Sequence, residues 1–234
     1  MKLTVNGLCA WYGRAQILFG VNLDARRGEV VALLGRNGAG KSTTLKSIAG
    51  LVAKRQGETV FESEDVSRLP VYEIVRKGLG YVPEDRRIFT ELTVGENLAV
   101  GRQPPREGVP HWTPEKLYEL FPNLKEMHRR PAGQMSGGEQ QMLTIARTLM
   151  GNPSLVLLDE PSEGLAPKIV EQMAEAILAM KREGVSVVLS EQNLHFARLI
   201  SSRAYVIEKG RIRFGGTIAE LDAHPEIRNA YLAM

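Results

Sequence analysis

The stretch Gly35-Arg36-Asn37-Gly38-Ala39-Gly40-Lys41-Ser42-Thr43 has the spacing Gly, four residues, Gly-Lys-Ser/Thr, which is typical of a phosphate-binding loop. The apolar run 29–34 before it predicts a buried strand, and the segment 42–51 after it predicts a helix. Glycines in such a loop let successive backbone N–H groups converge on phosphate oxygens at the positive end of a helix. The stretch therefore predicts an α/β fold around a nucleotide site, rather than a glycine-rich turn that happens to carry a lysine.

Individual residues of this loop have distinct expected roles. Lys41 is expected to reach the β- and γ-phosphates of the nucleotide, and the hydroxyl of Ser42 is expected to hold Mg²⁺. The residues expected to contact the nucleotide are Gly35, Asn37, Gly38, Ala39, Gly40, Lys41, Ser42 and Thr43.

The length and composition are those of an ordinary globular chain. Its 234 residues, 43% of them hydrophobic, suffice for one domain with a substantial core. Lys and Arg outnumber Asp and Glu by 30 to 27, and a net charge of +3 does not by itself indicate a nucleic-acid partner. The single cysteine, Cys9, excludes an intramolecular disulfide and favours a reducing, cytoplasmic compartment. Neither a signal peptide nor an apolar run of membrane-spanning length is visible, so any membrane role is expected to be peripheral.

Two carboxylates follow an apolar run that predicts another buried strand. The strand is expected at 155–158, and Asp159 and Glu160 come directly after it. Adjacent carboxylates at the end of an apolar strand are unfavourable unless they meet cations. In a nucleotide site Asp159 would hold Mg²⁺, commonly through water, and Glu160 would polarise the attacking water. The alternative is a pair of solvated carboxylates at the tip of a strand.

A second anion-binding candidate is the dipeptide Gly137-Gly138, which precedes an apolar-rich helix expected at 142–150. Its N–H groups and the dipole of the helix would point the same way. Alternatively, Ser136 is an ordinary helix N-cap, and Glu139 completes a capping box. The two interpretations are compatible.

The remaining expected elements surround this core. Alternating apolar and polar residues predict strands of an antiparallel layer at 3–5 and 21–24. Between them, Tyr12 either stacks on an adenine base or fills the core at the end of a strand. The sequence further predicts, in order, a strand at 59–61 opened by Gly57, a short helix at 73–77, a strand at 79–83, a mainly helical insertion at 84–130 with a loop at 103–110, a helix at 169–182, a strand at 185–189, a hairpin of 205–208 and 211–214, and a helical tail at 220–234. The strand 185–189 ends at Ser190-Glu191-Gln192-Asn193, where open α/β sheets bind their ligands.

In combination these motifs resemble the nucleotide-binding subunit of ATP-binding cassette (ABC) transporters over nearly the whole chain. The specific marker is Ser136-Gly137-Gly138-Glu139-Gln140, which looks like that family's signature sequence. The segments 35–43, 155–160 and 162–166 resemble its Walker A loop, Walker B strand and D-loop. Tyr12 falls where the family places an aromatic residue against adenine.

The resemblance implies a P-loop NTPase fold with a RecA-like core, an antiparallel β layer and an inserted helical subdomain. It implies one ABC ATPase domain over residues 1–234. Within it, residues 1–84 and 151–234 would form the nucleotide-binding core with the antiparallel layer, and residues 85–150 the helical signature subdomain.

Two positions depart from the general family pattern. Glu84 replaces the glutamine of the Q-loop, a position that contacts the nucleotide and the metal, and Gln192 replaces the switch histidine near the γ-phosphate. Both departures look like one ATPase subunit of branched-chain amino acid importers, whose relatives carry urea, short amides or aromatic acids. The resemblance thus implies catalytic roles for Glu160, Lys41 and Gln192. His195, one helical turn beyond Gln192, either points to the same place or is an exposed helical residue.

The resemblance also implies partners. Two such subunits, identical or paralogous, would pair head to tail, so that each ATP lies between one phosphate loop and the Ser136-Gly137-Gly138 segment of the other subunit. Two membrane-embedded permeases and an extracytoplasmic solute-binding protein would complete an importer, which places this chain on the inner face of the cell membrane. Asp85-Arg86-Arg87 would be a contact surface or only a solvated charge run.

Two functions are alternatives to that of an importer subunit. One is the energising subunit of a lipid or lipopolysaccharide exporter, and the other is a soluble ABC ATPase that acts on ribosomes or DNA. The latter is disfavoured, since no second cassette, coiled coil or zinc site is visible, and no nucleic-acid partner is expected.

Overall fold

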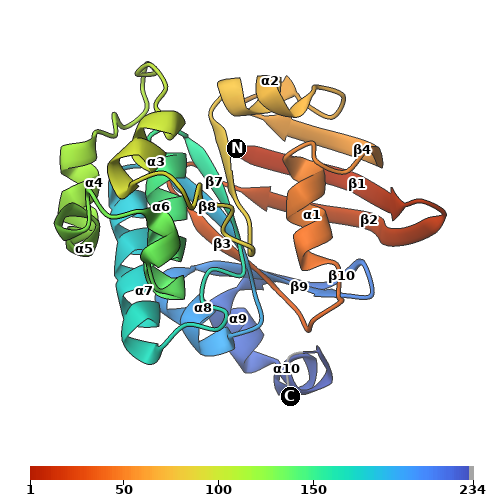
Figure 1. Cartoon of the computed structure of the whole chain (residues 1–234). Helices are drawn as coiled ribbons and strands as arrows, with labels where there is room; N and C mark the ends of the chain where they lie inside the picture. Colours follow the sequence, from red (N-terminus) through yellow and green to blue (C-terminus); the bar gives the residue numbers. More distant parts are fainter. Residues whose placement is uncertain (232–234) are drawn as a thin grey trace.

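Helix α1 (Lys41–Ile48) packs between two β-sheets (Figure 1). The computed structural model describes residues 1–231. One sheet has six strands in the order β10-β9-β3-β8-β7-β6, and the other has four in the order β2-β1-β4-β5. The predicted α/β fold with an additional antiparallel layer is confirmed.

The six-stranded sheet is parallel except for β10, which pairs antiparallel with β9. Its strands are β3 (Val30–Leu34), β6 (Leu79–Val82), β7 (Leu155–Asp159), β8 (Ser186–Glu191), β9 (Arg203–Glu208) and β10 (Arg211–Thr217). Val31 and Leu33 of β3 face the core that contains α1, whereas Val30, Ala32 and Leu34 face the opposite core. Burial on both faces explains why the strands read as continuous apolar runs.

The four-stranded sheet is antiparallel and longer than the sequence predicts. Its strands are β1 (Leu3–Tyr12), β2 (Ala15–Ala25), β4 (Lys54–Phe61) and β5 (Glu64–Asp65). The expectation that Gly57 opens β4 is wrong, because the strand begins at Lys54. Gly57 instead has φ 106°, and a Cβ atom there would lie 2.7 Å from the carbonyl oxygen of Gly7. The glycine is needed for a close approach of two strands, not for a strand end.

Most helices beyond α1 cover the other face of the six-stranded sheet or its ends, whereas Ile74 of the second helix packs into the core on the α1 side. The helices beyond α1 are α2 (Val71–Arg76), α3 (Val94–Gly101), α4 (Pro114–Leu120), α5 (Pro122–Glu126), a 3₁₀ turn η1 (Ala132–Gln134), α6 (Gly137–Leu149), α7 (Pro167–Arg182), α8 (Leu194–Ile200), α9 (Ile218–Ala223) and α10 (Pro225–Tyr231). The predicted tail helix at 220–234 is in fact two helices, since His224 adopts a non-helical conformation before Pro225. Residues 232–234 of that prediction lie outside the described part of the chain.

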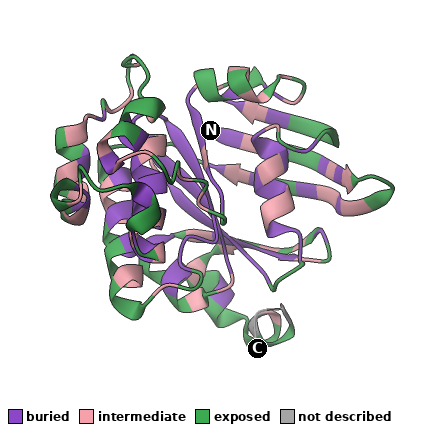
Figure 2. Ribbon diagram, viewed as in Figure 1, coloured by how far each residue is buried: buried purple, intermediate pink, exposed green. Residues whose placement is uncertain are grey.

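The helical segment between β6 and β7 shares one hydrophobic cluster with the sheet. Leu98 of α3, Leu117 of α4 and Leu143 of α6 belong to the same buried cluster as Val156 and Leu158 of β7. Figure 2 shows this buried region as continuous from the helices into the sheet. Across residues 1–231, no helix combines the length and the apolar character that a membrane crossing requires.

Candidate nucleotide-binding site

The loop between β3 and α1 is held in shape by the turn between β9 and β10. Gly210 in that turn donates from its N–H to the carbonyl oxygen of Ala39 (2.8 Å) and approaches β2 so closely that a Cβ atom would lie 1.8 Å from the carbonyl oxygen of Ile17. In the loop itself, Gly40 has φ 108°, a conformation that favours glycine. No side chain caps α1, so the N–H groups of its first turn remain available to an anion.

The ammonium group of Lys41 is buried and is fully engaged within the site. Its Nζ atom donates to the carbonyl oxygens of Gly35 (2.8 Å) and Arg36 (3.2 Å). It also lies 3.0 Å from Oε1 of Glu160. The cation of the loop and the carboxylate after β7 therefore neutralise each other in the chain alone.

Asp159 at the end of β7 is completely buried and is held by two hydroxyl groups. Ser190 Oγ donates to its Oδ1 atom (2.7 Å), and the phenol of Tyr81 donates to its Oδ2 atom (2.9 Å). Burial and the neighbouring Asp159 carboxylate raise the pKa of Tyr81, so this phenol remains a donor. The interpretation of Asp159 and Glu160 as solvated carboxylates is wrong, because both are buried.

Tyr81 and Ser190 were not identified from the sequence as partners of Asp159, although Ser190 was placed at the ligand-binding end of its strand. They come from β6 and β8, the two neighbours of β7 in the sheet, and their side chains meet Asp159 only because of that strand order. The signal that could have found them is the polar residue at the end of each apolar run.

Glu160 has an unusual backbone and one unsatisfied oxygen. Its φ of 47° lies in the left-handed region, and its N–H donates to Ser190 Oγ (3.0 Å). Its Oε1 atom pairs with Lys41, whereas no group among residues 1–231 is assigned as a donor to the buried Oε2 atom. A strained backbone at a strand end is a common property of functional residues.

Two further glutamates lie beside Glu160. Hydrogen bonding to Glu160, partial burial and the nearby Glu84 carboxylate raise the pKa of Glu163 to about 7. Glu191 is buried and accepts from the N–H groups of Ser162 (3.1 Å) and Asn193 (3.2 Å), and its burial raises its pKa. Glu191 thus ties the end of β8 to the segment after β7.

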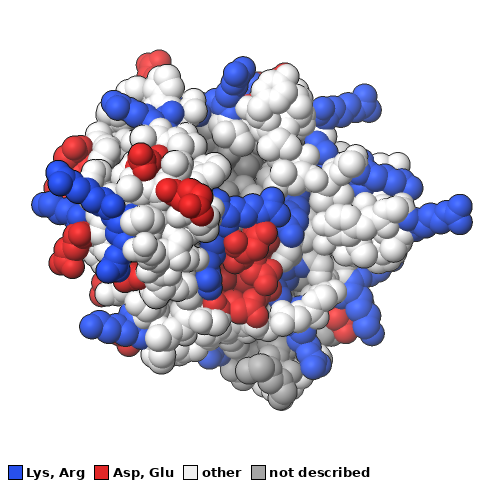
Figure 3. All heavy atoms as spheres, viewed as in Figure 1, with Lys and Arg blue, Asp and Glu red and all other residues white. Residues whose placement is uncertain are grey.

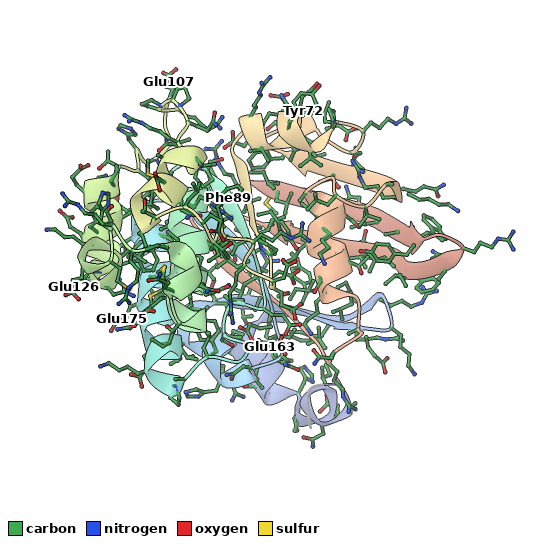
Figure 4. All side chains as sticks on the ribbon, in the orientation of Figure 1. Tyr72, Phe89, Glu107, Glu126, Glu163 and Glu175 are labelled. Atoms are coloured by element: carbon green, nitrogen blue, oxygen red, sulfur yellow. The ribbon has the colours of Figure 1, made fainter. Side chains whose placement is uncertain are left out.

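Gln192 reaches into the same group of residues. Its Nε2 atom lies 3.4 Å from Oε1 of Glu163. His195 is exposed on α8, as the second of its two sequence interpretations states. In Figure 3 acidic side chains gather near the centre of the visible face with basic side chains around them, and Figure 4 shows Glu163 in this region.

The Ser136-Gly137-Gly138 segment begins α6, which starts at Gly137 and not at 142 as predicted. The reason is the capping box, in which Ser136 Oγ accepts from Glu139 N–H (3.4 Å) and Glu139 Oε2 accepts from Ser136 N–H (2.7 Å). A Cβ atom on Gly137 would lie 2.8 Å from an Nη atom of Arg86. Within residues 1–231, no hydrogen bond or ion pair joins this segment to the phosphate loop.

The remaining predicted site residues lie at the rim. Tyr12 at the end of β1 is 50% exposed, so it does not fill the core. Ser42 is half-buried in the first turn of α1, and Glu84 is exposed after β6. The structure thus brings Lys41, which follows β3, together with Asp159 and Glu160 at the carboxyl end of β7, and Gln192 follows β8, the strand between them.

A strand, a glycine-rich loop with a buried lysine, and two consecutive carboxylates at the end of a second parallel strand of the same sheet define a P-loop nucleoside triphosphatase. A family model described as ABC transporter matches residues 18–163. The chain is 46% identical to the high-affinity branched-chain amino acid transport ATP-binding protein BraG of Pseudomonas aeruginosa, covering 98% of this chain and 99% of the relative. It is 35% identical to the lipopolysaccharide export system ATP-binding protein LptB of Haemophilus influenzae, covering 98% and 96%. Among solved structures, a nucleotide-free ATP-binding cassette from an ABC transporter superposes with a TM-score of 0.82 at 26% identity, covering 96% of each chain.

The ADP conformation of another ABC transporter cassette gives a TM-score of 0.81 at 27% identity, again with 96% of each chain covered. The chain therefore belongs to the ABC transporter family, as an ATP-binding cassette with ATPase function.

Proposed function

We propose that this chain is the ATP-hydrolysing subunit of a membrane importer for branched-chain amino acids or related small amides. The observation that carries the ATPase part is the meeting of Lys41, Asp159 and Glu160 behind a preformed phosphate loop. The 46% identity to a branched-chain amino acid transport protein, against 35% to a lipopolysaccharide export protein, supports the importer part.

The donor set fits a magnesium ion and a nucleoside triphosphate. Ser42, Asp159 and Glu84 supply hydroxyl and carboxylate oxygens, the ligands that Mg²⁺ prefers. The hydroxyls of Tyr81 and Ser190 orient Asp159 and leave its other lone pairs available. The ion would neutralise charge on the phosphate oxygens. The ring of Tyr12 is exposed enough to stack on the adenine base.

Hydrolysis requires that Lys41 and Glu160 separate. The phosphates of ATP would draw the ammonium group of Lys41 away from Oε1 of Glu160, because they carry more negative charge. Glu160 would then be free to accept a proton from the attacking water, while Gln192 donates a hydrogen bond to the γ-phosphate. In this view the ion pair of the chain alone is the resting form of the site.

A second cassette would complete each site. The Ser136-Gly137-Gly138 segment opens α6, a 13-residue helix whose N-terminus favours anions, yet it makes no polar contact with the phosphate loop of its own chain. We assign this segment to the γ-phosphate of the ATP that a second subunit binds. The same oligomer would need two permeases and an extracytoplasmic solute-binding protein to act as an importer.

Exposed apolar side chains on α2, α3 and the segment after β6 would contact the permeases. Tyr72, Val75, Phe89 and Val100 are between 44% and 58% exposed. Arg76 stacks on Tyr72 and Arg147 on Phe89, with guanidinium carbons 5.5 and 5.0 Å from the ring centres. Exposed rings held by arginines suit a protein interface. Docking there would keep the chain peripheral on the inner face of the membrane.

Copurification from membranes of the native host in mild detergent tests this function. The tagged chain should bring down two permeases and a second cassette, and the complex should hydrolyse ATP. Phe89→Ser should weaken permease recovery, whereas Leu199→Ser, which removes a similarly exposed apolar residue on α8, should not. Recovery of ribosomes or DNA in place of permeases would refute transport, and recovery of lipopolysaccharide-export partners would replace import by export.

A further inference from the structure

Arg106 lies in the loop between α3 and α4, and its guanidinium group joins two helices. Its Nε atom donates to the carbonyl oxygen of Asn152 (3.1 Å) in the turn after α6, and its Nη1 atom donates to that of Arg76, the last residue of α2. Its Nη2 atom lies between the two helices, 3.3 Å from the carbonyl oxygen of Val75 and 3.5 Å from that of Gly151. Within residues 1–231, no hydrogen bond or ion pair joins α2 to α6 directly.

These contacts suit the chemistry of an arginine side chain. Carbonyl oxygens at the C-terminal end of a helix lack partners within the helix and carry partial negative charge. A guanidinium group has five N–H donors in a rigid plane, so that one side chain can bind the carbonyl oxygens of two helices at once. Arg106 therefore fixes the end of α2 relative to the end of α6.

The loop that carries Arg106 is itself held by the turn after α6. Asn152 in this turn is buried and has φ 50°. Its Nδ2 atom donates to the carbonyl oxygens of Gln103 (2.9 Å) and Pro104 (3.2 Å), and its Oδ1 atom accepts from the N–H group of Trp112 (2.8 Å). Both ends of the loop are thereby bound to the residue whose carbonyl oxygen accepts from Arg106. The loop is thus an arm that is braced on α6 and reaches α2.

The two helices carry different parts of the proposed transporter contacts. Helix α2 exposes Tyr72 and Val75, which are assigned above to the permeases. Figure 4 shows Tyr72 and Glu107, the neighbour of Arg106, at the same edge of the molecule. Helix α6 is continuous over 13 residues and begins with the segment 136–138, which is assigned above to the ATP of a second subunit. Arg106 is therefore a polar link between the permease-facing helix and the helix that presents this segment.

We propose that Arg106 is a positioning residue that couples permease docking at α2 to the position of the segment 136–138 at the start of α6. The proposal rests on the proposed importer function. When a permease displaces α2, the guanidinium group would move the C-terminal end of α6 with it, and the segment at the other end would shift relative to the γ-phosphate. Neither Lys41 nor Glu160 is among the hydrogen-bond partners of Arg106, so ATP binding by the chain alone should not require this link.

Hydrogen exchange of the full chain without nucleotide tests the link itself. Arg106→Ala should raise amide exchange rates at both 75–78 and 150–152 by roughly 10-fold, the effect of losing hydrogen bonds to a charged group. Arg106→Lys keeps the charge but not the planar fork, so only part of the protection should return. Arg55→Ala is the matched control, because its guanidinium group also binds backbone carbonyl oxygens, all within residues 50–69, and exchange at 150–152 should stay at the parent rate. Faster exchange in Arg106→Ala at only one of the two segments, or at neither, would overturn the proposal.

ATP hydrolysis by the assembled transporter tests the coupling. The rate is measured with and without the solute-loaded binding protein. In Arg106→Ala the stimulation by that protein should fall about 5-fold or more, as expected for the loss of a coupling between sites, while the unstimulated rate and the KM for ATP stay near those of the parent. A purely structural role would lower the melting temperature and leave the stimulation unchanged, which is the result expected for Arg55→Ala.

Two outcomes of this assay separate the proposals. Equal stimulation of the parent and of Arg106→Ala, including none in either, overturns the role of Arg106 alone. A parent complex that does not hydrolyse ATP refutes the proposed function, and the coupling proposal fails with it.

Discussion

The Nζ atom of Lys41 lies 3.0 Å from the Oε1 atom of Glu160, and the two side chains are only 2% and 6% exposed. The pair joins the phosphate loop after β3 to the end of β7, across the intervening strand β8. A buried pair of this kind is sensitive to the loss of one partner, because the other charge is then left uncompensated. The stability of the fold is therefore expected to depend on this contact, and ATP binding is expected to depend on Lys41.

Lys41→Ala should abolish ATP binding and also destabilise the chain. The phosphates lose their cation, and Glu160 loses its partner, which should lower the free energy of unfolding by on the order of 3–5 kcal/mol. The fold thus has a use for this lysine besides the nucleotide, which the sequence alone does not indicate. Urea denaturation without nucleotide and equilibrium binding of ATP measure the two effects.

The double variant Lys41→Ala/Glu160→Gln is the control for that prediction. It removes both charges, so most of the lost stability should return while ATP binding stays absent. Unchanged stability in Lys41→Ala would show that the ion pair contributes nothing to folding.

Glu160→Gln should preserve nucleotide affinity and slow hydrolysis by a factor on the order of 10²–10⁴, the usual contribution of a positioned proton acceptor. An amide oxygen can still accept from Lys41, so the site should remain folded. Single-turnover hydrolysis in the assembled complex measures the effect, with Glu175→Gln as the control. Hydrolysis at the parent rate would mean that another group activates the water.

Arg203 links the two sheets through Asp24. Its Nη1 and Nη2 atoms donate to the two carboxylate oxygens of Asp24 on β2 (2.9 and 3.1 Å), and Tyr205 donates to the same carboxylate (2.8 Å). The hydrogen bond from Arg203 is the largest cause of the lowered pKa of Asp24. Because this pKa is depressed on folding, the stabilisation is present above the unfolded value of about 3.9 and is lost as the pH falls through the folded value.

Arg203→Ala should therefore lower the free energy of unfolding by about 1–2 kcal/mol at neutral pH, with allowance for partial exposure of the pair. The difference from the parent should shrink below about pH 4. Arg213→Ala, which breaks a more exposed pair with Glu208, should cost less. A difference that is independent of pH would show that Arg203 stabilises the chain by packing and not by charge.

The main strands of the fold and the phosphate loop could be predicted from the sequence because each depends on a local pattern. Apolar runs predicted the strands β3, β7 and β8, and the glycine spacing predicted the loop before α1. The expected start of α6 was wrong because the apolar pattern begins one turn after the capping box that starts the helix. A local pattern is sufficient to predict a structural feature that is formed by a single segment of the chain.

What the sequence did not reveal depends on neighbours that are distant in the chain. Tyr81 and Ser190 bind Asp159 because β6 and β8 flank β7, and no single segment encodes that order. The contact of Gln192 with Glu163 likewise joins the end of β8 to the turn after β7, in which Glu160 adopts φ 47°. The roles proposed for Tyr12, Glu84 and the residues 136–138 remain predictions.

Gln192, directly after β8, is proposed to sense the γ-phosphate, and its Nε2 atom lies 3.4 Å from Oε1 of Glu163. A glutamine amide can donate a hydrogen bond to a phosphate oxygen, but it cannot titrate near neutral pH or carry an imidazolium charge. Gln192→Ala should therefore lower turnover by removing the donor, whereas Gln192→His should retain substantial activity and add a pH dependence near the imidazole pKa of about 6.5. The measurement is the ATPase activity of the parent and both variants across pH in the assembled transporter.

His195→Ala is the matched control, because His195 is exposed on α8 and should not affect turnover. If Gln192→Ala keeps the parent rate while His195→Ala loses it, the sensor is His195, and the contact of Gln192 with Glu163 serves the structure of the site alone.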